Sequence, residues 1–356
     1  MAKRVKLADV ARAAGVSQGT ASNVFSRPEI VRTEVRHRVE ASAKELGYSG
    51  PDPKGRLLRG GKVNAIGVVV SEKLTDFFDD PYNREFMAGI AEVCDERGAG
   101  VSLISATDPR AIAWSIESAV VDGFVLQCVN YDGGRLIELA RKRELPFVAI
   151  DMDAGPDMST LDVDHREGAR LAAEHLVKLG HRKFGILSLE VNDDGHVGPV
   201  DRARRLAAED SVSRDRFRGY EDALAAAGVS FDDVPIMESP NDREEGAKMA
   251  AALLDADPAI TAVLAMSDVL ALSTMKMAKD RGLVVPGDIS IVGFDDIPEA
   301  ATATPPLTTV HQPIIEKGRR AAQLIFDRGA PRKELLPVSL MVRGSSGPAP
   351  TKRRAR

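Results

Sequence analysis

From residue 63 onward, the chain alternates short apolar runs rich in β-branched residues with longer amphipathic segments. Runs at 64–72, 100–106, 122–129 and 146–153 have the length and composition of buried strands, and helical periodicity fills the gaps between them. A second series follows, with apolar runs at 183–190, 260–268 and 289–296. This alternation predicts an α/β body of two doubly wound parallel-sheet subdomains, each with helices on both faces of its sheet.

The first 50 residues follow a different pattern, that of short helices separated by a turn. Apolar residues recur at helical spacing from Leu7 to Ala14, and Gly15 follows where the first helix must stop. Ser17 is well placed as the N-cap of a second helix that ends near residue 25, and Thr33 as the cap of a third. The pattern predicts an all-α helix-turn-helix headpiece.

A helix-turn-helix can place its second helix in the major groove of DNA, although small three-helix units also occur as plain packing modules. Residues 1–62 hold 13 Lys and Arg against 6 Asp and Glu, a net charge of +7. The remainder holds 35 against 47, a net charge of −12. A basic headpiece on an acidic body favours DNA binding, because only the headpiece would then meet phosphates.

Two sequence runs carry a family resemblance. Residues 5–25, V-K-L-A-D-V-A-R-A-A-G-V-S-x-x-T-A-S-N-V-F, and the following R-x-x-V-x-x-x-x-x-x-L-G-Y resemble the headpiece of the lactose and galactose repressor (LacI/GalR) family of bacterial transcriptional regulators. The resemblance extends almost to the C-terminus. It implies a periplasmic-binding-protein-like body, a homodimer on a pseudopalindromic operator in double-stranded DNA, most often as a repressor, and a small-molecule effector in place of a cofactor. The effector it implies is a carbohydrate or a derivative of one.

The resemblance also assigns DNA contacts within the headpiece. It gives base reading to Gln18, Gly19 and Asn23 of the second helix. It gives phosphate contacts to Ser17, Thr20 and Ser22, with Leu7 as a further DNA contact. The amides of Gln18 and Asn23 can engage adenine, whereas Gly19 offers no side chain.

Residues 50–62 are rich in Gly, Pro and basic side chains, which indicates a linker. By itself this composition is that of a flexible tether. The resemblance implies a hinge that forms a helix on DNA, with Arg56, Leu58 and Arg59 as contacts and Leu58 as an apolar wedge in the minor groove. Gly55 would weaken such a helix by about 1 kcal/mol.

Charged residues at strand ends suggest a ligand site in the body. Asp151 and Asp268 follow predicted strands, and Arg216 opens a predicted helix. Ligands of open α/β sheets bind at the carboxyl ends of strands, but an aspartate there can equally cap the next helix. The resemblance favours effector contacts, with Arg216 in R-x-x-G-Y, Asp268 in S-D-x-x-A-L and Tyr82 as an aromatic partner.

The predicted organisation has five parts. They are the headpiece (1–49), the hinge (50–62), a first subdomain (63–163 and 294–326), a second subdomain (164–293 and 327–345) and a disordered basic tail (346–356). The chain would cross between the subdomains three times, an arrangement that suits hinge closure about a ligand. The polar stretch 191–214 is predicted to be a surface loop carrying a short helix, in preference to a partial lid over the cleft.

Several other classes of protein are disfavoured by missing signals. No apolar run is long enough for a membrane helix, and the N-terminus lacks the apolar core of a secretory signal, so we expect a cytoplasmic, nucleoid-associated protein with no membrane partner. The sequence lacks G-x-G-x-x-G, P-loop and G-x-S-x-G motifs, and its six histidines show no metal-ligand spacing. We therefore expect no enzymatic activity and no metal site. The alternative is a solute-binding protein of the periplasmic sugar-binding type without gene regulation.

Overall fold

The chain forms two compact units in the computed structural model, Met1–Val63 and Asn64–Arg356, called the headpiece and the body below. The structure describes residues 5–50, 63–108, 112–127, 133–152, 154–209 and 211–351, without the side chains of 133–136 and 140. The hinge residues Arg56, Leu58 and Arg59 therefore lie outside the described residues, as do 352–356 of the predicted tail. The prediction of disorder was wrong for 346–351, because the backbone N–H groups of Gly347 and Ala349 donate to Ser290 and Leu179 of the body.

The headpiece contains helices α1 (Leu7–Ala13), α2 (Gln18–Ser26) and α3 (Thr33–Glu45), with the short 3-10 helix η1 (Pro28–Ile30) between the last two. This confirms the predicted helix-turn-helix. Its core consists of apolar side chains from all three α-helices, namely Leu7, Val10, Ala11, Ala14, Ala21, Val24, Val39 and Ala43. The prediction of a Thr33 cap was wrong, because Thr33 is the first residue of α3 and Arg32 precedes it without a capping side-chain bond.

The first subdomain is built on a six-stranded sheet in which every described pairing is parallel. Its order is β12 (Lys333–Leu336), β5 (Ser159–Val163), β4 (Phe147–Ile150), β3 (Phe124–Gln127), β1 (Ala65–Val70) and β2 (Gly100–Ser105). Consecutive residues of a strand point to opposite faces, so Val68 and Val70 pack in one apolar cluster and Val69 in another. The sheet is therefore buried on both sides, as the continuous apolar runs predict.

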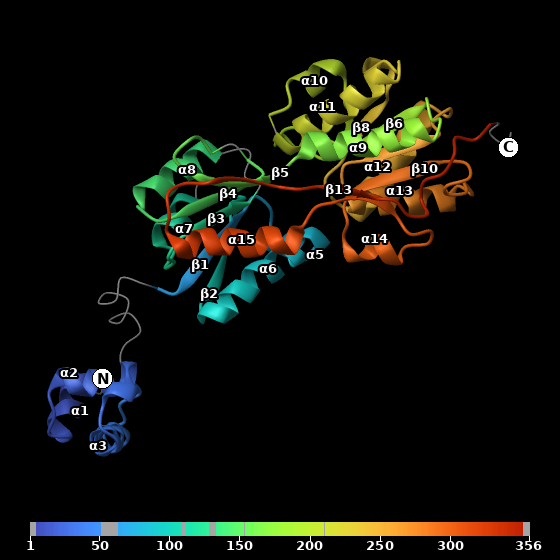
Figure 1. Ribbon diagram of the computed structural model, residues 1–356. Helices are drawn as coiled ribbons and strands as arrows, with labels where there is room; N and C mark the ends of the chain where they lie inside the picture. Colours follow the sequence, from blue (N-terminus) through green and yellow to red (C-terminus); the bar gives the residue numbers. More distant parts are fainter. Residues whose placement is uncertain are drawn as a thin grey trace. The chain divides into compact units, whose positions relative to one another are not determined.

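Helices cover both faces of this sheet (Figure 1). The helices α5 (Leu74–Asp79), α6 (Pro81–Arg97) and α15 (Ile314–Asp327) pack on the Val68 side. The helices α7 (Ile112–Ser118) and α8 (Gly133–Lys142) pack on the Val69 side. Helix α6 lies directly against α15, although more than two hundred residues separate them in sequence.

The second subdomain is built on a seven-stranded sheet that is parallel except at its two edges. Its order is β13 (Ser339–Met341), β11 (Thr308–His311), β10 (Ser290–Asp295), β9 (Ala262–Ala265), β6 (Phe184–Ser188), β8 (Ile236–Glu238) and β7 (Gly198–Pro199). Helices α9 (His165–Lys178) and α11 (Ser211–Ala226) cover one face, and α12 (Arg243–Ala256) and α13 (Asp268–Asp280) the other. The short helices are α10 (Arg202–Leu206), η2 (Phe231–Asp233) and α14 (Pro298–Thr302). The doubly wound architecture is confirmed.

Two strands of the body fall on the other side of the predicted boundaries, whereas helix α15 packs on the first subdomain and strand β13 pairs in the second sheet, as predicted. Residues 294–326 were assigned to the first subdomain, but β11 pairs with β10 in the second sheet. Residues 327–345 were assigned to the second, but β12 pairs with β5 in the first sheet. These strands were misassigned because pairing partners distant in sequence leave no local signal. The three predicted crossings follow β5, β11 and β12.

Candidate functional site

The N-terminus of α2 presents polar side chains on the headpiece surface. Ser17 caps the helix by accepting a hydrogen bond from the backbone N–H of Thr20 at 3.0 Å, as predicted, and the two hydroxyls lie 2.9 Å apart. Ser17, Gln18 and Gly19 are exposed, and Thr20, Ser22 and Asn23 are half-buried. Ala21 and Val24 turn inward to the headpiece core. The polar face of α2 is thus free of the packing that holds the helix in place.

Leu7 differs from the other predicted DNA contacts. Its side chain is only 8% exposed and belongs to the headpiece core. Because it is the first residue of α1, Leu7 can offer DNA its backbone N–H but little of its side chain.

Asp151 directly follows β4 and is buried between the two subdomains. Its carboxylate accepts a bond from the Lys317 ammonium at 2.7 Å and lies 3.1 Å from His165 Nε2. The Tyr82 hydroxyl donates to the same carboxylate at 3.3 Å. Burial raises the pKa of Asp151, but the charge of Lys317 and the hydrogen bond to His165 outweigh it and hold that pKa below its usual range. Asp151 is therefore an ionised, fully paired carboxylate.

Arg216 lies in α11 with its side chain buried. Its guanidinium stacks 3.6 Å from the centroid of the Phe294 ring and donates to the backbone carbonyl of Met266. The same group reaches His165 Nδ1 at 3.3 Å and lies 3.8 Å from the Asp295 carboxylate. Arg216 thus links the end of β10 to the start of α9.

These contacts close into a ring of side chains that spans both subdomains. We call the interdomain ring the six residues Asp151, His165, Arg216, Asp295, Gln312 and Lys317. Gln312 closes it by donating to Asp295 at 2.7 Å and accepting from Lys317 at 2.9 Å. The carboxylates of Asp151 and Asp295 are thus separated by His165 and Arg216 on one side of the ring and by Gln312 and Lys317 on the other. These partners matter because unpaired charges would be costly in a buried setting.

Two members of the interdomain ring have pKa values shifted by burial. Burial raises the pKa of Asp295 to about 7 although Arg216 lowers it, and the charge of Asp80 adds to the rise. Burial lowers the pKa of His165 even though Asp151 favours its charged form. Proton uptake in the ring near neutral pH would therefore occur at Asp295.

Asp268, the fourth predicted effector residue, is fully buried at the start of α13. Its carboxylate accepts bonds from the Thr309 hydroxyl at 2.5 Å and the Ile297 backbone N–H at 2.9 Å. A Cβ at Gly293 would lie 2.2 Å from the same carboxylate, so β10 needs glycine there. Burial, with Asp295 nearby, raises the pKa of Asp268 well above its usual value. These contacts fasten α13 to β10 and β11.

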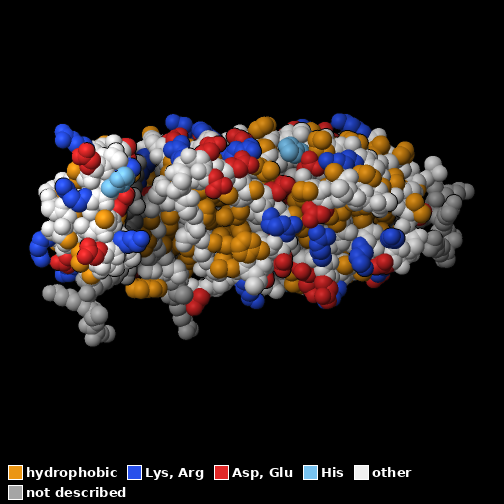
Figure 2. All heavy atoms as spheres, turned by 90° about the horizontal axis from the view of Figure 1, so that it is seen from below, with side chains coloured by type: hydrophobic (Ala, Val, Ile, Leu, Met, Phe, Trp, Pro, Cys, Tyr) orange, Lys and Arg blue, Asp and Glu red, His pale blue; other side chains and the backbone are white. Residues whose placement is uncertain are grey.

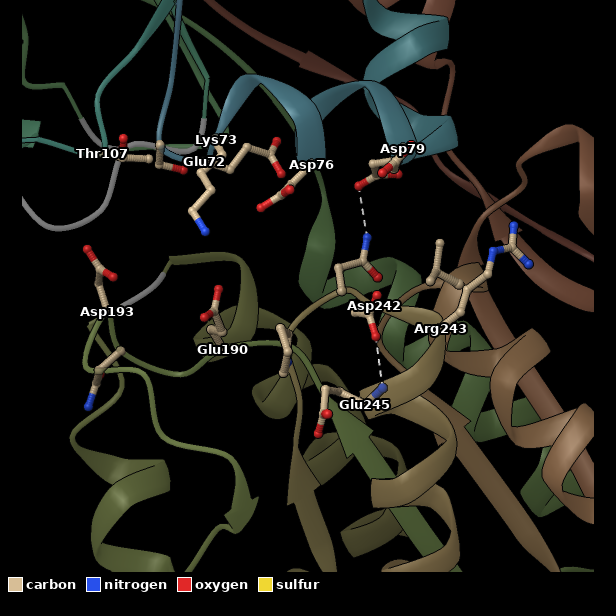
Figure 3. Close-up of a pocket in the computed structure, with 16 residues that line it drawn as sticks. Glu72, Lys73, Asp76, Asp79, Thr107, Glu190, Asp193, Asp242, Arg243 and Glu245 are labelled. Atoms are coloured by element: carbon tan, nitrogen blue, oxygen red, sulfur yellow. Dashed lines mark hydrogen bonds between the residues drawn. The ribbon is translucent and has the colours of Figure 1, made fainter.

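A cavity of about 900 Å³, the interdomain cleft, opens between the carboxyl ends of the two sheets (Figure 3). Its walls are Ser71, Glu72, Lys73, Asp76, Asp79, Asp80 and Thr107 from the first subdomain, and Glu190, Asn192, Asp193, Pro240, Asn241, Asp242, Arg243, Glu245 and Val269 from the second. Asn241 joins the walls by donating to Asp80 at 2.9 Å, and it accepts from Ser267 at 2.6 Å.

None of the four predicted effector residues lines the interdomain cleft. Asp151 lines a smaller cavity of about 500 Å³ together with His165, Ser211 and Arg214. Asp80 connects the two regions, because it lines the cleft and raises the pKa of Asp295 in the ring. The structure therefore brings Tyr82, Asp151 and Arg216 together beside the cleft instead of within its open volume.

The stretch 191–214 does more than the predicted surface loop. Asn192 and Asp193 line the interdomain cleft, and β7 extends the second sheet. Arg204 fixes the segment through Glu238 at 2.6 Å and Asp194 at 2.7 Å. The segment is thus both a sheet edge and part of a cleft wall.

Sequence reasoning missed four members of the interdomain ring, namely His165, Asp295, Gln312 and Lys317. Asp295 ends an apolar strand as Asp151 does, so the strand-end signal could have found it. Lys317 lies in an amphipathic helix among other basic residues, and nothing in that pattern distinguishes a buried lysine from an exposed one.

The described residues contain no helix long and apolar enough to cross a membrane, and no group of three or more potential metal ligands. Residues 6–50 match the family model of bacterial regulatory proteins of the lacI family, and 173–346 match the periplasmic-binding-protein-like domain. An HTH-type transcriptional regulator from Mycobacterium tuberculosis is 38% identical, covering 97% of this chain and 98% of that protein.

Solved structures of regulators are similar as well. The lac repressor dimer bound to operator and an anti-inducer is similar with a TM-score of 0.77 and 27% identity, covering 97% of this chain and 100% of that one. The complex of the transcriptional regulator CelR with cellobiose has a TM-score of 0.70 and 28% identity, covering 96% and 100%.

Proposed function

Because the chain belongs to the lacI family of bacterial regulatory proteins, we propose that it represses transcription by binding a pseudopalindromic operator as a homodimer. A small ligand in the interdomain cleft, a sugar or a derivative of one, would control its affinity for DNA. The observation that carries this proposal is one chain with a capped, polar-faced recognition helix and a two-subdomain body around a 900 Å³ cleft.

In the headpiece, α2 would enter the major groove. The exposed amide of Gln18 and the half-buried amide of Asn23 suit adenine, and Ser17, Thr20 and Ser22 would contact phosphates. Leu7 would contribute through its backbone, since its side chain fills the core. Gly19 would allow close approach without reading a base. The hinge contacts at Arg56, Leu58 and Arg59 remain part of the proposal.

In the body, the effector would act by favouring one arrangement of the two subdomains. A ligand alters DNA affinity only through its differential affinity for two conformations, and such coupling is typically about 1 to 3 kcal/mol. Tyr82, Asp151 and Arg216 belong to a polar network that crosses between the subdomains, so closure of the cleft would rearrange it. Asp268 would act by holding α13 against β10 and β11.

Self-association is supported by the surface and by a relative. Exposed large apolar side chains of the first subdomain include Leu74, Phe78 and Val101, and Figure 2 shows hydrophobic side chains gathered on one face of the molecule. A similar protein was solved as a dimer on operator DNA. Operator binding as a dimer places the proposed role at chromosomal DNA in the cytoplasm, with no catalytic step.

The test is fluorescence anisotropy of the full chain on duplexes tiled from the DNA upstream of its gene, with and without a panel of sugars. We expect one tile to bind far above the rest and a ligand to shift it. Asn23→Ala should weaken binding to that tile by about 1 to 3 kcal/mol and leave binding to random DNA unchanged. Ligand binding with no DNA binding would instead support a solute-binding protein.

Leu58→Ala tests the hinge separately. Loss of the apolar wedge should reduce both operator affinity and DNA bending, whereas random DNA without a bend should be bound as before. Unchanged bending would remove Leu58 from the DNA contacts while leaving the role of α2 intact.

A further inference from the structure

The walls of the interdomain cleft are strongly acidic. Eight carboxylic acids line it against two basic residues. The acids are Glu72, Asp76, Asp79, Asp80, Glu190, Asp193, Asp242 and Glu245. Glu72 and Asp76 on one wall and Glu190 and Asp193 on the other face the same open space (Figure 3). Like charges gathered in a cavity create a field that attracts cations and repels anions.

The two basic residues compensate little of this charge. Arg243 extends away from the centre of the cleft in Figure 3, and its guanidinium lies 3.9 Å from Glu299 outside the lining. Lys73 extends into the open space and is exposed. Glu245 pairs with Lys248 on its own helix at 2.6 Å. A single lysine thus faces most of the acidic lining.

The neighbouring interdomain ring shows how the protein surrounds a buried ammonium group with oxygen acceptors. There the ammonium of Lys317, fully buried, lies 2.7 Å from Asp151, 2.9 Å from Gln312 Oε1 and 3.2 Å from the Tyr82 hydroxyl. Oxygen acceptors around an ammonium make a complete site for an amine. In the cleft, carboxylate and amide oxygens, which are acceptors of the same kinds, surround an open cavity instead of a buried lysine.

A buried acceptor beside the cleft lacks a partner. Gln127, 5% exposed, is in register with Val70, the residue before Ser71 and Glu72 of the cleft wall. Its Nε2 donates to Asn83 at 2.6 Å, and Asn83 donates to Glu72 at 2.7 Å. Its Oε1 has no hydrogen-bond partner among the described residues. Gln127 is not part of the cleft lining, but through Asn83 it holds the Glu72 carboxylate, which is.

The spacing of the acids argues against a metal ion as the ligand. No three potential metal ligands among the described residues are grouped closely enough to hold an ion. A volume of about 900 Å³ instead suits an extended organic molecule. Pro240 and Val269 are the apolar residues of the lining, so the charged and polar side chains around them would select among ligands that fit the cleft.

We propose that the effector of the interdomain cleft is an organic cation that carries one or more ammonium groups, such as an amino sugar. This inference rests on the proposed function, since it names the ligand class of the same site. Carboxylates of both walls would contact the cation, so its binding would draw the walls together and relieve their mutual repulsion.

The first experiment is calorimetry on the full chain with matched pairs of probes. Glucosamine is compared with glucose, the disaccharide of glucosamine with cellobiose, and spermidine and MgCl2 are added as an acyclic amine and a metal ion. We expect an amine to bind at least about tenfold more tightly than its neutral counterpart, with the difference shrinking as salt screens the acids. A neutral sugar that binds as tightly, magnesium alone, or no amine binding at all would overturn the inference.

The second experiment uses variants that change the same charge in two places. Asp76→Asn combined with Asp193→Asn removes one exposed acid from each wall, whereas Asp95→Asn combined with Glu96→Gln removes two at the far end of α6. The cleft variant should bind the amine about tenfold more weakly than the wild type and should bind the neutral counterpart with unchanged affinity. Equal weakening by both variants would reduce the effect to general attraction by an acidic body.

These outcomes separate the ligand class from the regulatory function. Calorimetry requires no DNA, so amine binding without any DNA response would retain the ligand class and remove the proposed regulation. A change in DNA affinity caused by a neutral sugar alone would retain the proposed regulation and reject an amine as the ligand.

Discussion

The interdomain ring and the interdomain cleft lie side by side between the same two subdomains, yet they handle charge in opposite ways. In the ring, Asp151 and Asp295 are buried and lie within hydrogen-bond or ion-pair distance of Lys317, His165, Gln312 and Arg216. In the cleft, eight acids share two basic residues around open space. Burial forces each charge of the ring to find a partner, whereas water in the open cleft lets like charges coexist.

The comparison gives a simple rule for this molecule. Neutralising a charge in the ring should destabilise the fold, because the opposite charge stays buried without a partner. Neutralising an acid of the cleft should be harmless or stabilising, because it removes repulsion. Four variants test the rule, in decreasing order of expected effect.

Lys317→Met should have the largest effect. It leaves the buried Asp151 carboxylate without its ammonium and should lower the free energy of unfolding by about 3 to 5 kcal/mol, measured by chemical denaturation. Lys276→Met on the exposed face of α13 is the matched control, where a surface pair contributes about 0 to 1 kcal/mol. Similar losses at both positions would show that the ring is no more than a surface network.

Arg216→Ala should be less severe. It removes the stacking on Phe294 and the bonds to Met266 and His165, and should cost about 2 to 3 kcal/mol of stability. The effector response should disappear while DNA affinity without ligand stays close to that of the wild type. The neighbouring exposed Arg218→Ala should change neither property, and loss of ligand-free DNA binding in Arg216→Ala would assign Arg216 a structural role alone.

Glu72→Gln should stabilise the protein at high pH. Burial, together with Asp80, raises the pKa of Glu72 to about 7, so the folded state pays to ionise it. The unfolded chain ionises this group near its ordinary value of 4.5, so wild-type stability falls as pH rises from there to about 7. The variant should gain roughly 1 to 2 kcal/mol above that range and nothing below it, a figure discounted for partial exposure.

Thermal unfolding of Glu72→Gln across that pH range is the measurement, and Glu96→Gln at an exposed position of α6 is its control. A gain that does not vary with pH would come from packing and would contradict the charge argument.

The cleft pair Asp76→Asn with Asp193→Asn should show the smallest change. Both side chains are exposed, so the free energy of unfolding should rise by no more than about 0.5 kcal/mol, and only at low salt where repulsion is unscreened. Denaturation at two salt concentrations measures it. A loss comparable to that of Lys317→Met would place these acids in a paired network and remove the contrast with the ring.

Much of the fold could be predicted because its signals are local. Consecutive residues such as Val68 and Val69 pack on opposite faces of one sheet, and the uninterrupted apolar runs predicted such strands. Ser17 caps α2 through Thr20, three residues away. Strand order was harder to predict from sequence, because no local pattern shows which strands β11 and β12 pair with.

The sequence by itself determined the headpiece, the two-sheet body and the family, because helix caps, hydrophobic periodicity and motifs each depend on residues close together in the chain. Asp151 and Asp268 carry the same strand-end signal, but only tertiary structure decides their partners. Lys317 reaches Asp151 across 166 positions, and Thr309 reaches Asp268 across 41. One aspartate thus joins a network that crosses the subdomains and the other fastens a helix within one of them. The cleft, likewise, gathers acids from segments that are neighbours only in the folded chain.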